Sequence, residues 1–302
     1  MRRLACIALG LLGIVGLGTA GCHHDRPPSP AAALDAGVTL STTAWGHCGP
    51  LECRQYESVA EAFEGALASH PRVVAVGEAH AQRGTTVRSS AYHFTYEILP
   101  LLVGRASDLL VEAMKPPSGC GKTTEVVRGQ QAVVTEKQAP TDQGEYVTMG
   151  TRARELGIVP DLLRPSCDDL ATVEASGDDA VPTSLAMIAR LTRTQVDKLL
   201  TRDEQSPGDA NKLVVTYGGA LHNDPAPKAE RAIWSFAPAL LERTNGRYVA
   251  VDLYVPELID GSDAWKRLGF YPYYDIARDG AKTTVFRDGK SFVIILPRTA
   301  GK

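Results

Sequence analysis

The sequence predicts an α/β protein with a mainly parallel central sheet flanked by helices, together with a helical or loop insertion and a C-terminal antiparallel hairpin. Apolar, β-branched-rich runs alternate along the chain with segments of helical periodicity, which is the order that produces a parallel sheet covered by helices. The four long runs are apolar on both faces, as strands buried from both sides are. The composition agrees, because 44% hydrophobic and 22% charged residues are typical of one globular body with a substantial core.

The expected elements follow one another from about residue 70 onward. β-Branched-rich runs predict the strands, helical spacing of apolar residues predicts the helices, and Asp288-Gly289 between two apolar runs predicts a hairpin turn. In chain order we expect a strand at 72–76, a helix at 89–103, a strand at 108–113, a long polar stretch, a helix at 146–156, a short strand at 158–159, a helix at 183–201, a strand at 212–217, a helix at 228–243, a strand at 248–253, and a hairpin that pairs 283–287 with 291–296. We expect this hairpin to add an antiparallel edge to the sheet.

The amino terminus carries an export signal. Arg2 and Arg3 precede an apolar stretch that runs from Leu4 to Gly21, as in a secretory signal peptide. The small residues immediately before Cys22 resemble a bacterial lipobox, in which the cysteine becomes the lipidated first residue of the mature protein. An uncleaved membrane anchor is the alternative, because the apolar stretch is just long enough to span a bilayer.

Three parts of the chain follow from this signal. We expect a lipoprotein signal peptide at 1–21, a flexible tether rich in Pro, Ala, Ser and Thr at 22–44, and a single α/β domain at 45–302. The protein would then be a lipoprotein of the bacterial cell envelope, on the periplasmic or outer-membrane face, that contacts the membrane through lipidated Cys22.

Four cysteines remain after the signal and the lipid site, and exported proteins usually pair such cysteines. Of the three possible connectivities we favour Cys48–Cys53 with Cys120–Cys167. The first pair flanks a short turn that contains Gly and Pro, and the second can tie a long insertion to the body of the protein. A four-cysteine zinc site is the alternative, but the sequence shows only one close pair.

The segment 115–124 looks like a phosphate-binding P-loop, yet Pro116 stands where that motif needs its first glycine. Proline offers no amide to a phosphate and fixes its own φ, and no clear helix is expected after this segment. We therefore expect no nucleotide partner. Nucleic acid is also disfavoured, because 32 basic residues stand against 35 acidic ones and give a net charge of −3.

Two carboxylates and two imidazoles are expected at the carboxyl ends of the predicted parallel strands. Glu78 and His80 follow the first strand and can point the same way, because side chains alternate along an extended chain. Glu112 lies at the end of the strand predicted at 108–113, and His222 follows the strand predicted at 212–217. In open α/β sheets, ligands bind in the crevice beyond these strand ends, so the sequence predicts one site built from the four residues.

The same residues resemble a known superfamily. Gly77-Glu78-Ala79-His80 after a strand, a glutamate at the end of the next strand, and a later Gly-Gly-x-x-His that ends at His222 are similar to motifs of the superfamily that contains Tiki proteases, ChaN-like haem-uptake lipoproteins, TraB/PrgY proteins and erythromycin esterases. The first motif and the lipoprotein-type amino terminus resemble the ChaN-like branch most. The resemblance covers roughly 69–253 and differs from that branch at 81–84, where Ala-Gln-Arg-Gly replaces an acidic, histidine-bearing run.

Hydrolysis is the chemistry that these groups predict. Glutamate and histidine suit Zn, Mn or Co, and a bound divalent ion lowers the pKa of its water, so we expect a metal-assisted hydrolase of an ester or peptide bond. The predicted catalytic residues and metal ligands are the same four: Glu78, His80, Glu112 and His222. Without a metal, Glu78 could orient His80 as general base, and the resemblance to erythromycin esterases implies that Arg83 or Arg88 stabilises an oxyanion.

Other functions stay open beside this one. The resemblance to ChaN-like proteins implies a non-covalent haem-binding, iron-uptake lipoprotein without catalytic activity, which would need a flat apolar face with a Tyr or His aimed at the iron. A catalytically silent interaction domain on a lipid anchor is a third possibility. The enzyme hypothesis needs a small-molecule or peptide substrate and a polar pocket around the four residues.

Overall fold

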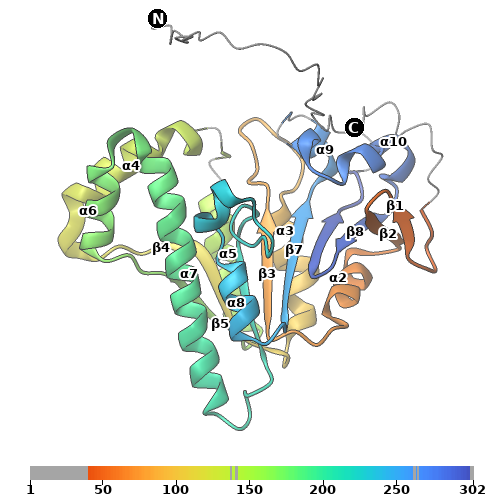
Figure 1. Cartoon of the computed structure of the whole chain (residues 1–302), viewed down its shortest axis with the longest axis horizontal. Helices are drawn as coiled ribbons and strands as arrows, with labels where there is room; N and C mark the ends of the chain where they lie inside the picture. The colour runs from red at the N-terminus through yellow and green to blue at the C-terminus, as the bar shows by residue number, and fades with distance from the viewer. Residues whose placement is uncertain (1–39, 137, 140–141, 261–262, 264, 300–302) are drawn as a thin grey trace, which may run out of the picture.

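A nine-stranded mixed sheet forms the centre of the protein in a computed structural model (Figure 1). The structure describes residues 40–136, 138–139, 142–260, 263 and 265–299. The predicted signal peptide, the lipidation site Cys22 and most of the tether lie outside these residues. The α/β fold with a mainly parallel sheet and flanking helices is confirmed.

The strands lie in the order β1-β2-β8-β9-β7-β3-β6-β4-β5. Their bounds are β1 Gly46–Cys48, β2 Leu51–Tyr56, β3 Val73–Glu78, β4 Ala106–Met114, β5 Val159–Leu163, β6 Leu213–Gly219, β7 Tyr248–Tyr254, β8 Thr283–Asp288 and β9 Ser291–Ile295. From β9 through β7, β3, β6 and β4 to β5 the neighbouring strands are parallel. β3 therefore lies in the middle of the parallel part, and its carboxyl end is surrounded by the ends of other strands.

The predicted C-terminal hairpin is confirmed, but its place at the edge of the sheet is wrong. β9 pairs in parallel with β7, and β8 pairs with β2, which in turn pairs with β1. The β1–β2 hairpin was not predicted, because both strands are short and β2 carries the polar residues Glu52, Arg54 and Gln55. This hairpin covers the strand edge that β8 would otherwise leave unpaired.

Helices cover both faces of the sheet. The main ones are α2 Val59–Leu67, α3 Ser90–His93, α4 Gly121–Thr135, α5 Asp142–Glu155, α6 Cys167–Ala175, α7 Ala180–Glu204, α8 Ala237–Arg243, α9 Pro256–Asp260 and α10 Ile276–Asp279. α3 continues through a π-helical turn, Phe94–Ile98, into a 3-10 turn, Leu99–Leu102, so the helix predicted at 89–103 is helical throughout with three geometries. Shorter 3-10 turns include Ser118–Cys120 and Ala229–Trp234.

Alternation along β3 divides the core into two layers. Val74 and Val76 pack with α2, α5 and the π-helical turn on one face, which we call the α5 face. Val73 and Ala75 pack with α7 and α8 on the other, the α7 face. All four side chains are almost fully buried. Figure 1 shows α7 and α8 in front of the strands. Because β3 is covered on both faces, its free end is the place where polar groups can be reached.

The long polar stretch predicted between 113 and 146 contains the helix α4, and a second helix that was not predicted, α6, follows the predicted strand at 158–159. The two helices pack with each other and with the amino-terminal part of α7 (Figure 1). The expectation of no clear helix after residue 124 is therefore wrong. Of the apolar residues of α4 whose burial is described, only Val127 is buried, and such a pattern is too weak to read from the sequence. A small separate core that also includes Leu170 and Val173 holds the insertion together.

Both predicted disulfides are confirmed. Cys48–Cys53 joins β1 to β2 with a Cα–Cα distance of 5.8 Å, and Cys120–Cys167 joins the start of α4 to the start of α6 with 5.4 Å. The second closes a sequence separation of 47 residues and so staples the insertion as expected. Within the described ranges, no helix combines the length and apolar character that crossing a membrane requires.

Candidate functional site at the carboxyl ends of the strands

Glu78 is the buried centre of the site. It is the last residue of β3, lies on the α5 face and is 3% exposed. The Tyr146 hydroxyl donates to Glu78 Oε1 at 2.7 Å, and the Tyr217 hydroxyl donates to Oε2 at 2.6 Å. Nδ1 of His80 lies 3.0 Å from Oε1. A buried carboxylate needs such partners, and here two phenols and an imidazole hold it in one orientation.

The contact with Glu78 fixes the tautomer of His80. A carboxylate only accepts hydrogen bonds, so Nδ1 of His80 donates and Nε2 is the nitrogen that can accept a proton. The His80 side chain is 27% exposed, which places it at the border between the core and solvent. Sequence alternation had predicted that Glu78 and His80 share a side, and their 3.0 Å contact agrees with it. The pair has the geometry of an oriented general base.

Tyrosine protonation supports this arrangement. Burial, with a further contribution from the negative charge of Glu78, raises the pKa of Tyr217 well above its ordinary value, so its hydroxyl remains a donor. Glu145 lies one residue before Tyr146 on α5 and accepts from the Ser89 hydroxyl at 2.7 Å. Burial and then the charge of Glu78 raise the pKa of Glu145. The α5 face thus contributes a second carboxyl group, that of Glu145, near Glu78.

A second pair stands opposite the first. Glu112, near the end of β4, accepts the backbone N–H of Gly219 at its Oε2, 2.8 Å away. Its Oε1 lies 3.7 Å from Nε2 of His222. Nδ1 of His222 lies 2.7 Å from the carbonyl oxygen of Trp234 and therefore donates to it. In both histidines Nδ1 donates to an acceptor, so in the neutral ring Nε2 is the nitrogen that carries no hydrogen.

Local breaks in helix structure hold His222 in place. The helix predicted at 228–243 is interrupted, because the 3-10 turn ends at Trp234 and α8 begins only at Ala237, with Pro238 in its first turn. In the gap, the Ser235 hydroxyl donates to the carbonyl oxygen of His222 at 3.1 Å, and the Phe236 N–H donates to the same oxygen at 3.0 Å. The interruption therefore anchors the loop that carries His222.

The two pairs come from opposite faces of the sheet. Glu78 points to the α5 face with Val74 and Val76, whereas Glu112 follows the parity of Leu110, which packs on the α7 face. The side chains of the two pairs lie close together at the carboxyl end of β6, beside Gly219. A Cβ placed on Gly219 would lie 3.4 Å from Nε2 of His80, 3.9 Å from Oε2 of Glu112 and 4.0 Å from Cδ2 of His222. Because glycine has no side chain, a space remains beside Gly219, and both Glu–His pairs border this space.

Glycines at this edge allow the strand ends to approach one another. A Cβ on Gly218 would overlap the carboxyl group of Glu112. A Cβ on Gly77 would come within 2.7 Å of both the side-chain nitrogen of Asn223 and Oδ1 of Asp252. Neither position tolerates a side chain without movement of its neighbours. Gly77 and Gly218 are therefore required for packing of the site.

Asn223 connects the His222 loop to the sheet. Its side-chain amide donates to Oδ1 of Asp252 on β7 at 2.9 Å and to the carbonyl oxygen of Ala75 at 3.2 Å. The Tyr254 hydroxyl donates to Oδ2 of Asp252 at 3.2 Å. Burial raises the pKa of Asp252 to about 6, and the two hydrogen bonds only partly oppose this shift. Asp252 is thus a positioning residue that acts through Asn223.

The two arginines suggested for oxyanion stabilisation are both exposed. Arg88 lies over the ring of Tyr92, with 4.4 Å between its guanidinium carbon and the ring centroid. Arg83 lies in the turn after His80, where the backbone carbonyl of Ala81 accepts from the N–H of Ala139 at 2.7 Å. An oxyanion role for either arginine stays a prediction.

A metal ion would need ligands from both pairs. Nε2 of His80 and of His222 and the carboxylate of Glu112 have suitable chemistry, and histidine ligands commonly donate their other nitrogen to an acceptor as these two do. Among the residues that the structure describes, however, no group of three or more His, Cys, Asp or Glu side chains is arranged to hold a metal ion. The metal-ligand role of the four residues stays a prediction.

Several contributors to this site were not predicted from the sequence, namely Tyr146, Tyr217, Asn223, Asp252 and the role of Gly219 in leaving space between the two pairs. Tyr217 and Asn223 stand beside the motif glycines and His222, so proximity to the motif was an available signal. Tyr146 begins the helix predicted at 146–156, and nothing local relates it to Glu78, 68 residues away in sequence.

Comparison of the chain with protein-family models, with curated proteins and with solved structures finds no match. Membership of the Tiki and ChaN-like superfamily therefore stays a prediction that rests on the short motifs around Glu78, Glu112 and His222.

Proposed function

We propose that the protein is a hydrolase of ester or peptide bonds in which His80 is the general base. The observation that carries the proposal is the contact between Glu78 and His80, which fixes the imidazole with Nε2 beside the space at Gly219. Glu112 and His222 border the same space from the other face of the sheet. Residues with this division of roles, a base and a group that orients it, are the usual parts of hydrolytic sites.

In the proposed reaction the His80–Glu78 pair transfers the proton and the Glu112–His222 pair positions the substrate. Nε2 of His80 takes a proton from a water molecule, and the resulting hydroxide oxygen attacks the carbonyl carbon of the substrate. Glu78 stabilises the imidazolium that forms, and its hydrogen bonds from Tyr146 and Tyr217 keep it from turning away. The proton on His80 then passes to the leaving oxygen or nitrogen as the bond to the carbonyl carbon breaks. Glu112 and His222 position the substrate across Gly219.

A divalent metal ion is compatible with the donors, since His80, His222 and Glu112 offer two imidazole nitrogens and a carboxylate. When bound, such an ion would polarise the water or the carbonyl group. In the arrangement described, these side chains would have to rotate to share one ion. Glu78 would keep its orienting role, because both of its oxygens already accept hydrogen bonds.

The proposed setting is the bacterial cell envelope, with the enzyme held on the membrane by lipidated Cys22. Two observations support it: the lipobox-like sequence before Cys22, and the two disulfides, which persist in oxidising compartments. The substrate would then be a small ester or a peptide that reaches the envelope.

The test compares two histidines that both contact a glutamate. His80→Ala should lower the rate of p-nitrophenyl acetate or casein-peptide hydrolysis by 100-fold or more, the usual effect of losing a general base. His93 contacts Glu97 at 2.7 Å on the helix surface, and His93→Ala should leave the rate unchanged. Gly219→Ala fills the shared space without overlap and should also abolish hydrolysis, while Gly208→Ala, which meets nothing within 4 Å, should not.

Equal activity of wild type and His80→Ala, with both proteins folded by circular dichroism, would contradict the proposal. Metal content of wild type, His80→Ala and His222→Ala should be determined on the same samples. Loss of a stoichiometric ion in both variants would identify the metal-assisted form of the reaction, and unchanged metal content with lost activity would identify the metal-free form.

Haem binding is the second candidate function. One observation favours it: the rings of Tyr92 and Tyr96 pack 4.6 Å apart on the surface, Tyr96 is 49% exposed, and Arg88 lies over Tyr92. A visible absorption scan after haem addition should show a Soret shift that Tyr96→Phe or Tyr92→Phe alters. Hydrolysis that depends on His80, without such a shift, would favour the enzyme.

A further inference from the structure

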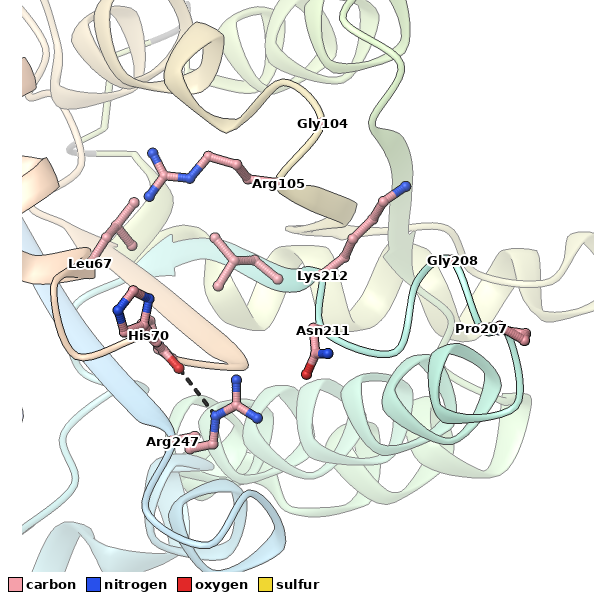
Figure 2. A pocket seen from close by; sticks show the side chains of 11 residues that line it. Leu67, His70, Gly104, Arg105, Pro207, Gly208, Asn211, Lys212 and Arg247 are labelled. Atoms are coloured by element: carbon pink, nitrogen blue, oxygen red, sulfur yellow. Dashed lines mark hydrogen bonds between the residues drawn. The ribbon is translucent and has the colours of Figure 1, made fainter.

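A cleft of about 410 Å³ lies at the opposite end of the sheet from the candidate hydrolytic site (Figure 2). Four basic residues line it, namely His70, Arg105, Lys212 and Arg247, and we call it the basic cleft. None of the described residues that line it is acidic. Figure 2 shows the Arg247 side chain beside His70, whereas the side chains of Arg105 and Lys212 extend in different directions from their strand starts.

The basic residues of the cleft recur at equivalent positions, just before the start of a strand. Arg105 immediately precedes β4, Lys212 immediately precedes β6, and Arg247 immediately precedes β7. Arg72 immediately precedes β3, and His70 stands two residues earlier. The strands β7, β3, β6 and β4 are neighbours in the sheet, so four adjacent strands each begin just after a cation.

Backbone hydrogen bonds fix the walls of the cleft. The N–H of Arg72 donates to the carbonyl oxygen of Arg247 at 2.7 Å, and the N–H of Leu213 donates to that of Arg105 at 2.8 Å. The N–H of Val214 donates to the carbonyl of Arg72 at 3.0 Å. The cationic side chains therefore project from strand starts that are tied together, which keeps the cost of ordering them on binding low.

The cations of the cleft are only partly neutralised. Arg105 pairs with Glu64, and Lys212 pairs with Asp209 at 2.7 Å. Nε of Arg247 donates to the carbonyl oxygen of His70 at 3.1 Å, and within the described part of the chain no carboxylate pairs with Arg247. Its terminal nitrogens, which present the two parallel donors that suit a phosphate, have no protein acceptor there.

Arg72 adds a buried charge behind this surface. It is 5% exposed, and its Nη1 donates to the carbonyl oxygens of Asp209 and Lys212, on the loop that lines the cleft. Its Nη2 is buried and has no hydrogen-bond partner among the described residues. Burial lowers the pKa of Arg72, and the nearby Arg247 contributes to this shift while Asp203 opposes it. A bound anion would relieve this accumulation of positive charge.

We propose that the basic cleft binds a small anion that carries one or more phosphate groups. Arg105 and Lys212 already pair with Glu64 and Asp209, so the charge left for an anion is that of Arg247, with buried Arg72 behind it. A cavity of about 410 Å³ has room for a phosphate monoester or a pyrophosphate. Arg247 offers paired donors and Lys212 a point charge, the usual combination around phosphate oxygens. A soluble phosphate compound and the headgroup of an anionic phospholipid share this chemistry.

The test uses pyrophosphate as probe and the intact domain as protein. Isothermal titration in buffers of matched ionic strength should show binding of one pyrophosphate per chain. Arg247→Gln and Lys212→Gln should each weaken it about tenfold, because each removes a charge-assisted hydrogen bond. Arg128→Gln removes an equal charge from the surface of α4, where Arg128 lies 3.5 Å from Glu125, and should leave the affinity unchanged.

A second arm identifies the source of the anion. Vesicles of phosphatidylcholine with and without phosphatidylglycerol should be sedimented with wild type and with Arg247→Gln. Cosedimentation that requires phosphatidylglycerol, is lost in Arg247→Gln and is competed by pyrophosphate points to a lipid headgroup. Pyrophosphate binding without cosedimentation points to a soluble phosphate compound, and both outcomes support the cleft as a phosphate site.

Two results would overturn the proposal. One is that wild type shows no pyrophosphate binding in the titration and no competition by pyrophosphate in the vesicle experiment. The other is equal weakening by Arg128→Gln and Arg247→Gln, which would show attraction by general charge alone. Urea unfolding of each variant should precede the titration, and Lys212→Gln gives an independent result if Arg247→Gln fails to fold. Hydrolysis that depends on His80 is a separate measurement, so the two proposals can fail separately.

Discussion

The two ends of the parallel sheet are built on opposite principles. At the carboxyl end, Glu78 and Glu112 come from opposite faces and are held by short contacts, and glycines 77 and 218 leave no room for a side chain. At the amino end, cations surround an open cavity, and Gly208 on its wall meets nothing within 4 Å of a Cβ position. The carboxyl end holds its side chains in a fixed geometry, and the amino end presents positive charge.

This difference teaches what each end can do. A site that moves protons needs a base in a set orientation, because transfer depends on distances of hydrogen-bond length. A site that attracts an anion needs charge more than exact placement, because Coulomb attraction acts over longer distances. The same strands deliver carboxylates at one end and arginine or lysine at the other, so function can be separated along a single sheet.

The largest expected effect tests close packing at the carboxyl end. Gly77→Ala places a methyl group within 2.7 Å of Asn223 and Asp252 and should lower the free energy of unfolding by on the order of 2–3 kcal/mol. Gly208→Ala at the amino end should change it by less than about 0.5 kcal/mol. Urea unfolding measures both. Similar values for the two variants would remove the contrast in packing between the ends.

A smaller effect tests whether Glu78 depends on its phenol donors. Tyr217→Phe leaves one oxygen of a buried carboxylate without its 2.6 Å hydrogen bond and should cost about 1–2 kcal/mol of unfolding free energy. Arg105→Gln at the amino end removes an exposed ion pair with Glu64 and should cost about 0.5 kcal/mol or less. Denaturant unfolding of both variants gives the comparison, and an unaffected Tyr217→Phe protein would contradict the assigned role.

The smallest effect concerns pH and the Asp252–Asn223 link. The pKa of Asp252 is about 6 in the folded protein, above the value of about 4 expected in the unfolded chain, so the folded state binds more protons between these pH values. The contribution of Asp252 to the free energy of unfolding is therefore fully present below about pH 4 and is lost as the pH rises through about 6.

Asp252→Asn has no proton to lose, so its stability relative to wild type should rise between pH 4 and pH 7.5. Because Asp252 is half-buried, we expect a gain of only about 1 kcal/mol across this range. Urea unfolding of both proteins at the two pH values measures it. A stability difference that does not change with pH would contradict the assigned shift.

Much of the parallel sheet could be predicted from sequence, because β3, β4, β6 and β7 are apolar runs that need no partner to be recognised. The β1–β2 hairpin could not, since its strands gain their burial from β8, more than 200 residues later. α4 was missed for a similar reason, because it is held mainly by the disulfide at Cys120 and by α6 and α7 rather than by its own apolar face.

The residues at the two ends of the sheet could be predicted from the sequence to different extents. The motif residues Glu78, His80, Glu112 and His222 could be placed at strand ends, but their faces depend on register, which local sequence does not give. The cations at the amino end carried a simpler signal, a basic residue immediately before each strand. It was hidden because the predicted strands began at 72 and 212 and so included Arg72 and Lys212 within them.

The pairing of β2 with β8 has a consequence for the order in which the chain folds. Glu52 and Arg287 pair across this ladder, 235 residues apart, so β2 has no partner on that side until nearly the whole chain has been synthesised. The Cys48–Cys53 hairpin can close early because it is local, yet the edge of β2 that pairs with β8 stays exposed to other strands until then. A chaperone, or fast completion of the C-terminal hairpin, would therefore decide how much of the protein escapes aggregation.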